Sequence, residues 1–248
     1  MSPAMPPRRT ALLVSLLFSV GCAEAPDEVA GAQAVPPATS APSPVASAPV
    51  ASDSVVVVFF GDSLTAGYGL ANPGREAYPA LVGDTLRAAG VPVRVVNAGN
   101  SGETSAGGLR RVDWVLGRSR PDVFVLALGA NDGLRGQDPA AMRENLRAIL
   151  QKVRAAAPEA RLVVAGMEAL PNYGADYVAR FRAVFPDVAR EFDADLVPFL
   201  LEGVAGVRGL NQGDQVHPTA AGQQVLARTV AAVVVPVVRE AAEAKAGA

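Results

Sequence analysis

Short runs of continuous apolar residues recur along the chain after residue 54. The first run, VVVVFF at residues 55–60, is rich in β-branched and aromatic side chains and is broken by Gly61. A run of this kind is typical of a strand that is buried on both faces of a sheet. Four further runs predict strands at residues 93–96, 123–128, 162–165 and 196–198.

Helical patterns fill the stretches that follow these strands. Asp138 before Pro139 is an N-cap followed by proline at the first helical position, and Pro218-Thr219 marks the start of the last helix. Strands that alternate with helices predict right-handed βαβ units, and therefore a single α/β domain with a five-stranded parallel sheet covered on both faces. The helices are expected at about residues 76–89, 104–118, 139–156, 175–192 and 219–243.

The first 22 residues predict an export signal. Arg8 and Arg9 precede an apolar stretch at residues 11–20, which is shorter than the roughly 20 residues that span a membrane. The stretch ends in SVGC, which resembles the cleavage site of a bacterial lipoprotein. This resemblance implies removal of residues 1–21 and attachment of a lipid to Cys22. The alternative is an ordinary secretory signal with an incidental cysteine.

Residues 23–53 are dominated by Ala, Pro, Ser and Val, and nine of the 20 prolines of the chain lie before residue 54. A segment of this composition buries too little apolar surface to offset its ordering entropy, so we expect a disordered tether. The folded domain is expected at residues 54–248. Because Ala23 and not Asp follows Cys22, the pattern resembles outer-membrane sorting, with the domain facing the periplasm. A secreted protein is the alternative.

Charge and composition exclude several classes of protein. The chain has 22 basic and 24 acidic side chains, of which two basic and four acidic ones lie in the first 53 residues. Residues 54–248 therefore carry 20 of each. A neutral domain argues against nucleic-acid binding, which needs a clustered basic surface. With one Cys and one His in the chain, a disulfide framework and the usual zinc site are also excluded. Any chemistry that needs an imidazole depends on His217.

Four polar and glycine-rich clusters lie where chemistry is expected in such a fold. Three follow the first three strands, and the fourth precedes the last helix. In an open parallel sheet, ligands bind outside the carboxyl ends of the strands, so these clusters should meet at one edge. They are GDSL at residues 61–64, NAGNSG at 97–102, GANDG at 129–133 and DQVHP at 214–218.

The residue types in these clusters fit nucleophilic catalysis. Ser63 is a candidate nucleophile, which needs a base to take its proton, and His217 is the only imidazole. Asp214 lies three residues before His217, so its carboxylate can accept the Nδ1 proton and leave Nε2 free toward the serine. The backbone N–H groups of Ser63 and Gly102 and the amide of Asn131 are candidate donors to the oxyanion formed by attack on an acyl carbon.

Each feature has a structural explanation when it is taken alone. A serine after a strand is commonly a helix cap, and Asp-x-x-His can be a surface turn. All of them together, with the only histidine among them, favour a catalytic site. The chain also lacks the G-x-S-x-G motif of ordinary α/β-hydrolases and the glycine-rich phosphate and dinucleotide motifs.

The four clusters resemble the conserved blocks of the SGNH (GDSL) hydrolase family. The similarity extends from residue 55 to about 235 and is greatest to the bacterial thioesterase I, protease I, lysophospholipase L1 and arylesterase subgroup. The resemblance implies a flavodoxin-like three-layer α/β/α fold and no metal or cofactor. We expect the protein to be a monomer. The resemblance also implies that Ser63 is the nucleophile, His217 the base and Asp214 its orienting group, and that Gly102 and Asn131 are oxyanion donors.

Substrates implied by the resemblance are small acyl esters or lipids: aryl esters, short to medium acyl esters, acyl thioesters and lysophospholipids. Three glycine-rich segments, at residues 133–136, 171–174 and 203–213, are candidates to border an acyl groove. Two alternatives stay open. One is a carbohydrate or peptidoglycan O-acetylesterase on the same fold, and the other is a noncatalytic envelope lipoprotein that uses the fold for binding.

Overall fold

The computed structural model describes residues 54–247. Cys22, the signal expected at residues 1–22 and the tether expected at residues 23–53 lie outside the described residues, so these expectations stay predictions. Among residues 54–247, no helix is both long enough and apolar enough to cross a membrane.

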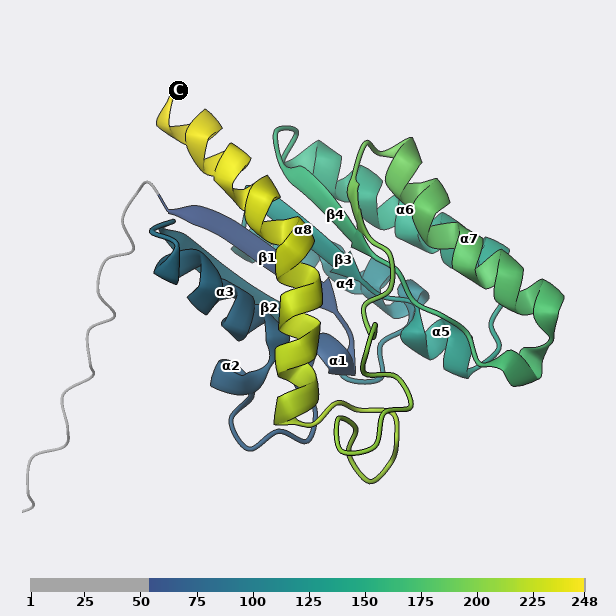
Figure 1. The fold of residues 1–248 in the computed structure, drawn as a ribbon. Helices are drawn as coiled ribbons and strands as arrows, with labels where there is room; N and C mark the ends of the chain where they lie inside the picture. The colour runs from purple at the N-terminus through teal and green to yellow at the C-terminus, as the bar shows by residue number, and fades with distance from the viewer. Residues whose placement is uncertain (1–53, 248) are drawn as a thin grey trace, which may run out of the picture. The chain divides into compact units, whose positions relative to one another are not determined.

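A fully parallel five-stranded sheet forms the centre of the domain (Figure 1), which confirms the predicted fold class. Its strand order is β2-β1-β3-β4-β5, so the chain leaves β1 toward one edge of the sheet and later returns to build the other side from β3 onward. A crevice at the carboxyl ends of β1 and β3 is expected where the order reverses in this way. The strands are β1 (Val55–Gly61), β2 (Val93–Gly99), β3 (Val123–Ala127), β4 (Arg161–Ala165) and β5 (Asp195–Val197).

The long helices cover both faces of the sheet. On one face α3 (Tyr78–Ala88) packs against α8 (Ala220–Ala246), and on the other α4 (Ser105–Arg118), α6 (Pro139–Ala156) and α7 (Ala175–Glu191) lie in sequence (Figure 1). The result is the three-layer α/β/α arrangement expected from the alternating pattern. Apolar side chains on each strand can then be buried on both sides.

Side chains of β1 illustrate this double burial. Phe59 meets the ring of Tyr78 from α3 edge-on, with centroids 5.7 Å apart, whereas Phe60 packs beside Phe124 of β3 at 5.6 Å. All four rings are completely buried. The continuous apolar run at residues 55–60 therefore has the structure that its sequence predicts.

Several short helices were absent from the sequence prediction. The stretch expected as one helix at residues 76–89 is divided, because Ala77 has extended backbone angles between α2 (Pro73–Glu76) and α3. A 3₁₀ turn, η1, occupies Pro171–Tyr173. Two more helices, α1 (Ser63–Ala66) and α5 (Ala130–Leu134), directly follow β1 and β3. Helices of four or five residues are too short to display an apolar period.

A buried glutamine joins three of these elements. Gln223 of α8 accepts a hydrogen bond from the Tyr78 backbone N–H at 2.8 Å and donates one to the Leu64 carbonyl at 3.2 Å. Its side chain is 1% exposed, and it satisfies two backbone groups at the starts of α3 and α1 that would otherwise be buried without partners. The turn that carries Ser63 is thereby fixed against the last helix.

Candidate active site

Ser63 is the first residue of α1, directly after the carboxyl end of β1. The preceding residue, Asp62, caps this helix by accepting a hydrogen bond from the Leu64 N–H at 3.0 Å. At the other end of the four-residue helix, Gly67 adopts a left-handed conformation with φ of 76°. The short helix therefore turns the chain sharply and leaves the Ser63 hydroxyl at the edge of the sheet.

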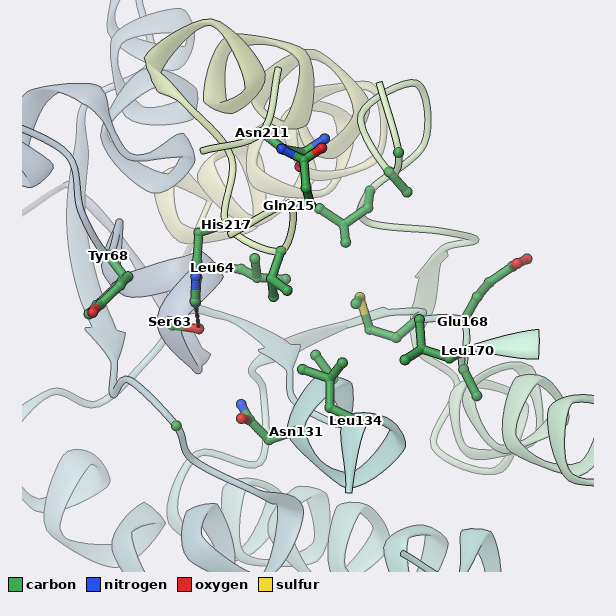
Figure 2. Close-up of a pocket in the computed structure, with 18 of the residues that line it drawn as sticks. Ser63, Leu64, Tyr68, Asn131, Leu134, Glu168, Leu170, Asn211, Gln215 and His217 are labelled. Atoms are coloured by element: carbon green, nitrogen blue, oxygen red, sulfur yellow. Dashed lines mark hydrogen bonds between the residues drawn. The ribbon is translucent and has the colours of Figure 1, made fainter. Parts of the chain in front are cut away.

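Ser63, His217 and Asp214 form a chain of hydrogen bonds. The Nε2 atom of His217 lies 2.9 Å from the Ser63 Oγ, and its Nδ1 atom lies 2.7 Å from Asp214 Oδ2. Figure 2 shows the imidazole directed at the serine hydroxyl. A carboxylate only accepts hydrogen bonds, so Nδ1 carries the proton and Nε2 is the acceptor for the serine.

Asp214 is held in the charged form that this arrangement needs. Its Oδ1 atom accepts hydrogen bonds from the backbone N–H groups of Val216 at 2.9 Å and His217 at 3.0 Å. The backbone and side-chain hydrogen bonds from His217, together with that from Val216, lower the pKa of Asp214 to about 2. The carboxylate therefore remains ionised at any pH at which the domain is expected to work.

The loop that carries the histidine is tied back to the beginning of the domain by Gln212. The Gln212 Nε2 group donates to the Tyr68 carbonyl at 2.7 Å and to the Pro218 carbonyl at 2.9 Å, and its backbone N–H donates to the His217 carbonyl at 2.7 Å. The Tyr68 ring lies against the imidazole, with ring centroids 4.6 Å apart. Sequence reasoning missed Gln212 and Tyr68, because neither residue type marks a catalytic site by itself.

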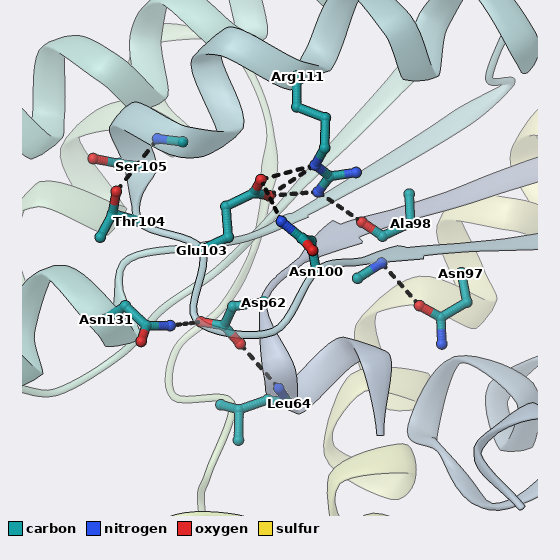
Figure 3. Close-up of polar contacts among 12 residues, drawn as sticks. Asp62, Leu64, Asn97, Ala98, Asn100, Glu103, Thr104, Ser105, Arg111 and Asn131 are labelled. Atoms are coloured by element: carbon teal, nitrogen blue, oxygen red, sulfur yellow. Dashed lines mark hydrogen bonds and ion pairs between the residues drawn. The ribbon is translucent and has the colours of Figure 1, made fainter. Parts of the chain in front are cut away.

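Asn131 and Gly102 lie at the same pocket as Ser63 and His217. Asn131 is the second residue of α5, after the carboxyl end of β3, and its amide points toward the carboxylate of Asp62, with Nδ2 3.4 Å from Oδ2 (Figure 3). Gly102 has φ of 77°, a left-handed conformation that favours glycine. A Cβ at this position would meet only the Arg135 guanidinium at 3.9 Å, so the backbone conformation, and not crowding within the protein, requires the glycine.

Residues 100–103, which we call the oxyanion loop after the role predicted for Gly102, are braced on both sides. The Asn100 N–H donates to the Gly61 carbonyl at 2.9 Å, and Arg135 Nη2 donates to the Gly102 carbonyl at 3.0 Å. Glu103 is 7% exposed and forms a bidentate ion pair with Arg111 (Figure 3). The loop is thus held in position before any substrate arrives.

Asp62 is the buried acid of the site. Its side chain is 1% exposed, and desolvation raises its pKa from 3.8 to about 7, although the hydrogen bonds from Leu64 and Asn131 act in the opposite direction. The sequence pattern predicted no role for this residue. Its position next to the candidate nucleophile was visible in the sequence, but the inward direction of its side chain was not.

A mainly apolar pocket of about 680 Å³ opens beside these polar groups (Figure 2). Of the three segments expected to border a groove, residues 133–136 contribute Leu134 and residues 203–213 contribute Ala205, Gly206 and Asn211. Residues 171–174 do not line it, and Tyr173 instead donates a hydrogen bond to the Leu134 carbonyl at 2.9 Å and supports the wall from behind. Apolar walls come from Leu64, Leu134, Met167, Leu170, Phe199, Leu201 and Val216.

The structure brings four of the predicted site residues, Ser63, Gly102, Asn131 and His217, to one pocket, and the fifth, Asp214, lies behind the histidine. Cys22 lies outside the described residues. Within residues 54–247, no group of three or more His, Cys, Asp and Glu side chains is arranged to hold a metal ion. The arrangement is a hydrogen-bonded serine, histidine and aspartate at the end of an apolar pocket, on a flavodoxin-like sheet. These features define a serine-hydrolase type of site.

Comparison with known proteins gives the family. Residues 59–225 match the GDSL-like Lipase/Acylhydrolase family, and the chain belongs to it. It is therefore an enzyme that hydrolyses ester bonds, as the sequence analysis expected.

Among curated proteins, the chain is 42% identical over 180 residues to Esterase TesA of Pseudomonas aeruginosa. The matched region covers 73% of this chain and 87% of that protein. The chain is 38% identical over 188 residues to Thioesterase 1/protease 1/lysophospholipase L1 of Escherichia coli K12, covering 76% and 86%. An Arylesterase of Vibrio mimicus is 35% identical over 181 residues, covering 73% and 88%.

Solved structures agree with these relatives. A crystal structure of TesA has a TM-score of 0.68 at 40% identity and covers 75% of this chain and 99% of that one. The SGNH-hydrolase family esterase AlinE4 has a TM-score of 0.62 at 43% identity, with 72% and 94% covered. The predicted family and fold are confirmed.

The raised pKa of Asp62 predicts a specific dependence of stability on pH. Between pH 3.8 and about 7 the unfolded chain has lost this proton and the folded protein keeps it, so rising pH favours unfolding in this window and has no further effect through Asp62 above it. Asp62→Asn removes the titration. The free energy of unfolding of the variant relative to wild type should therefore increase from about pH 4 to about 7 and then stay level.

Denaturant unfolding at a series of pH values measures this difference. Asp176→Asn is the matched control, because that carboxylate is 86% exposed, and its curve should run parallel to wild type. A constant difference between Asp62→Asn and wild type across the window would contradict the raised pKa of Asp62.

Proposed function

We propose that the protein is a serine esterase that hydrolyses carboxylic acyl esters through a Ser63–His217–Asp214 triad and an acyl-enzyme. The observation that carries this proposal is the continuous hydrogen-bonded relay from Asp214 through His217 to the Ser63 hydroxyl, at the end of an apolar pocket. The proposed reaction uses no metal or cofactor.

In the first half of the reaction the Ser63 Oγ attacks the acyl carbon while His217 Nε2 takes the hydroxyl proton. The imidazolium that results is stabilised by Asp214, whose low pKa keeps it a carboxylate beside the positive ring. His217 then gives the same proton to the departing alcohol or thiol, and the acyl group remains on Ser63. In the second half water attacks the acyl-enzyme, with His217 again as base, and a carboxylic acid leaves.

The negative charge that develops on the carbonyl oxygen needs donors that are fixed in advance. We assign this role to the backbone N–H groups of Ser63 and Gly102 and to the Asn131 amide. Bracing of the oxyanion loop supports the assignment, because donors that are already in place cost little reorganisation during the reaction. Asp62 accepts one proton of the Asn131 amide, which leaves the second proton for the oxyanion.

The pocket favours acyl groups longer than acetyl. Its volume of about 680 Å³ and its walls of Leu134, Met167 and Leu170 fit a short to medium hydrocarbon chain, which gains free energy on leaving water. Aryl esters, acyl thioesters and lysophospholipids are the proposed substrates, and the relatives named esterase, thioesterase, lysophospholipase and arylesterase support this range. An O-acetylesterase would leave most of the pocket empty, and a pure binding protein would not need the relay.

We further propose that the enzyme is a monomer attached by a lipid at Cys22 to the bacterial envelope, facing the periplasm. The tether predicted at residues 23–53 would separate attachment from catalysis. Cys22→Ala should therefore release the protein from membranes with unchanged activity on soluble esters, measured by fractionation and assay. A variant that still sediments with the membranes would contradict lipid attachment at this residue.

Ser63→Ala tests the proposed nucleophile. We expect loss of essentially all ester hydrolysis and of labelling by a fluorophosphonate, because the hydroxyl supplies the bond to the acyl group. Thermal unfolding should stay close to wild type, since within residues 54–247 the Ser63 hydroxyl forms a hydrogen bond with His217 only. A folded variant that keeps more than a few per cent of wild-type activity would remove Ser63 from this role.

Asn131 tests the oxyanion assignment. Asn131→Ala removes a donor that acts mainly in the transition state, so kcat should fall about 100-fold or more with little change in KM. Asn131→Asp should be at least as damaging, because a carboxylate would face the developing charge. Steady-state kinetics with a nitrophenyl ester measures both effects. An Asn131→Asp enzyme within a few-fold of wild-type kcat would show that Asn131 is only a structural turn residue.

A further inference from the structure

A second pocket lies on the other side of the oxyanion loop. It has a volume of about 600 Å³ and is bordered by residues 100–104 and by side chains of α4. Ser101 and Gly102 line both this pocket and the apolar one. The oxyanion loop is therefore the wall between two cavities, and the scissile carbonyl, which must bind at that loop, would lie next to both.

Three arginines line this second pocket, and they are not equivalent. The guanidinium of Arg111 is committed to the ion pair with Glu103 and to the Ala98 carbonyl at 2.9 Å, and it lies 4.3 Å from the centre of the Phe60 ring. Glu103 is almost fully buried, and its negative charge is balanced by the positive charge of Arg111 in this ion pair.

The other two arginines remain available to a ligand. Arg110 is exposed and forms no hydrogen bond or ion pair with any residue between 54 and 247. Arg135 is also exposed and donates one hydrogen bond to the Gly102 carbonyl, and it interacts electrostatically with the buried carboxyl of Asp132. Most of its guanidinium donors stay free. The pocket thus has an excess of positive charge in a domain that is neutral as a whole.

An aromatic side chain completes the rim. Trp114 is 60% exposed, the highest value among the large apolar side chains of the described residues, and lies one helical turn after Arg110 on the same face of α4. The guanidinium of Arg118 lies 4.5 Å from the centre of its ring. A large exposed aromatic side chain beside arginines that keep free donors is typical of a binding site.

We propose that Arg110, Trp114 and Arg135 bind a phosphoester group on the leaving group of the substrate. This inference rests on the proposed acyl transfer at Ser63. Two substituents diverge from the scissile carbonyl, and the acyl chain takes the apolar pocket, so the alcohol or thiol part must extend away from it. The second pocket is the neighbouring cavity across the oxyanion loop. Arginine matches the geometry of phosphate oxygens through its planar fork, and the tryptophan packs on the less polar part of the same group.

Phosphoesters of this kind occur on lysophospholipid headgroups and on phosphorylated thiols, and matched substrates distinguish these sources. One pair is 1-octanoylglycerol and 1-octanoylglycerol 3-phosphate, and the other is octanoyl-pantetheine and octanoyl-phosphopantetheine. Members of a pair differ only in the phosphate. For wild type, Arg110→Gln and the control Arg239→Gln, kcat/KM is measured on all four at low ionic strength. Arg239 is an exposed arginine of α8, outside both pockets.

We expect Arg110→Gln to lower kcat/KM about tenfold for the phosphorylated member of at least one pair, mainly through KM, because one charge-assisted hydrogen bond is lost. The unphosphorylated members should be unaffected, and Arg239→Gln should match wild type throughout. An effect on the glycerol pair alone identifies a lipid headgroup, and an effect on the thioester pair alone identifies a phosphorylated thiol. Equal effects on both members of each pair, or none at all, would overturn the proposal.

Binding can also be followed without turnover, because Trp114 is the only tryptophan of the chain. Titration of the wild-type protein with glycerol 3-phosphate and with phosphopantetheine should change its fluorescence saturably for at least one of them. Glycerol and pantetheine should have no effect, and Arg110→Gln should lose the response. If no octanoyl ester is hydrolysed but the fluorescence response is present, the proposed esterase function fails and the anion site stands. No response to either phosphoester would exclude the site even in an active esterase.

Discussion

The geometry of the site depends on the two hydrogen bonds that the side chain of Asp62 accepts. This side chain is buried between the end of β1 and α5, where it caps the helix that begins with Ser63 and accepts from the amide of Asn131. Gly61, the last residue of β1, leaves room for this packing, because a Cβ there would lie 2.1 Å from the Thr65 Oγ1 and 2.8 Å from the Ala127 carbonyl. A single buried acid therefore fixes the proposed nucleophile, Ser63, and one candidate oxyanion donor, Asn131, relative to each other, and its burial raises its own pKa.

The proposed general base, His217, comes from a distant part of the chain, since it lies 154 residues after Ser63. Because His217 and Ser63 are far apart in the sequence, the position of His217 depends on contacts between the segments that carry these two residues. Gln212 provides one by hydrogen bonding to the Tyr68 carbonyl, and Gln223 provides another by joining α8 to the start of α1. Both side chains are uncharged, so they hold the two halves of the site together at any pH.

The oxyanion loop divides the carboxyl-terminal edge of the sheet into two unlike environments. On one side, apolar walls suit a hydrocarbon chain, and on the other, exposed arginines and a tryptophan suit a charged group. An ester substrate is divided in the same way, with the acyl chain on one side of its carbonyl carbon and the leaving group on the other. The ion pair between Glu103 and Arg111 supports the loop from below without adding net charge, which leaves Arg110 and Arg135 to determine the potential in the second pocket.

The sequence by itself determined the parallel sheet and the choice of candidate site residues, because buried strands need continuous apolar runs and because a chain with one histidine leaves one choice of imidazole. It also located these residues at strand ends, which meet in any parallel sheet. Only the tertiary structure decided the inward direction of Asp62, the contacts of Gln212 and Gln223, and the second pocket. These features depend on contacts between side chains of elements that lie far apart in the sequence. A local pattern of residue types does not determine such contacts.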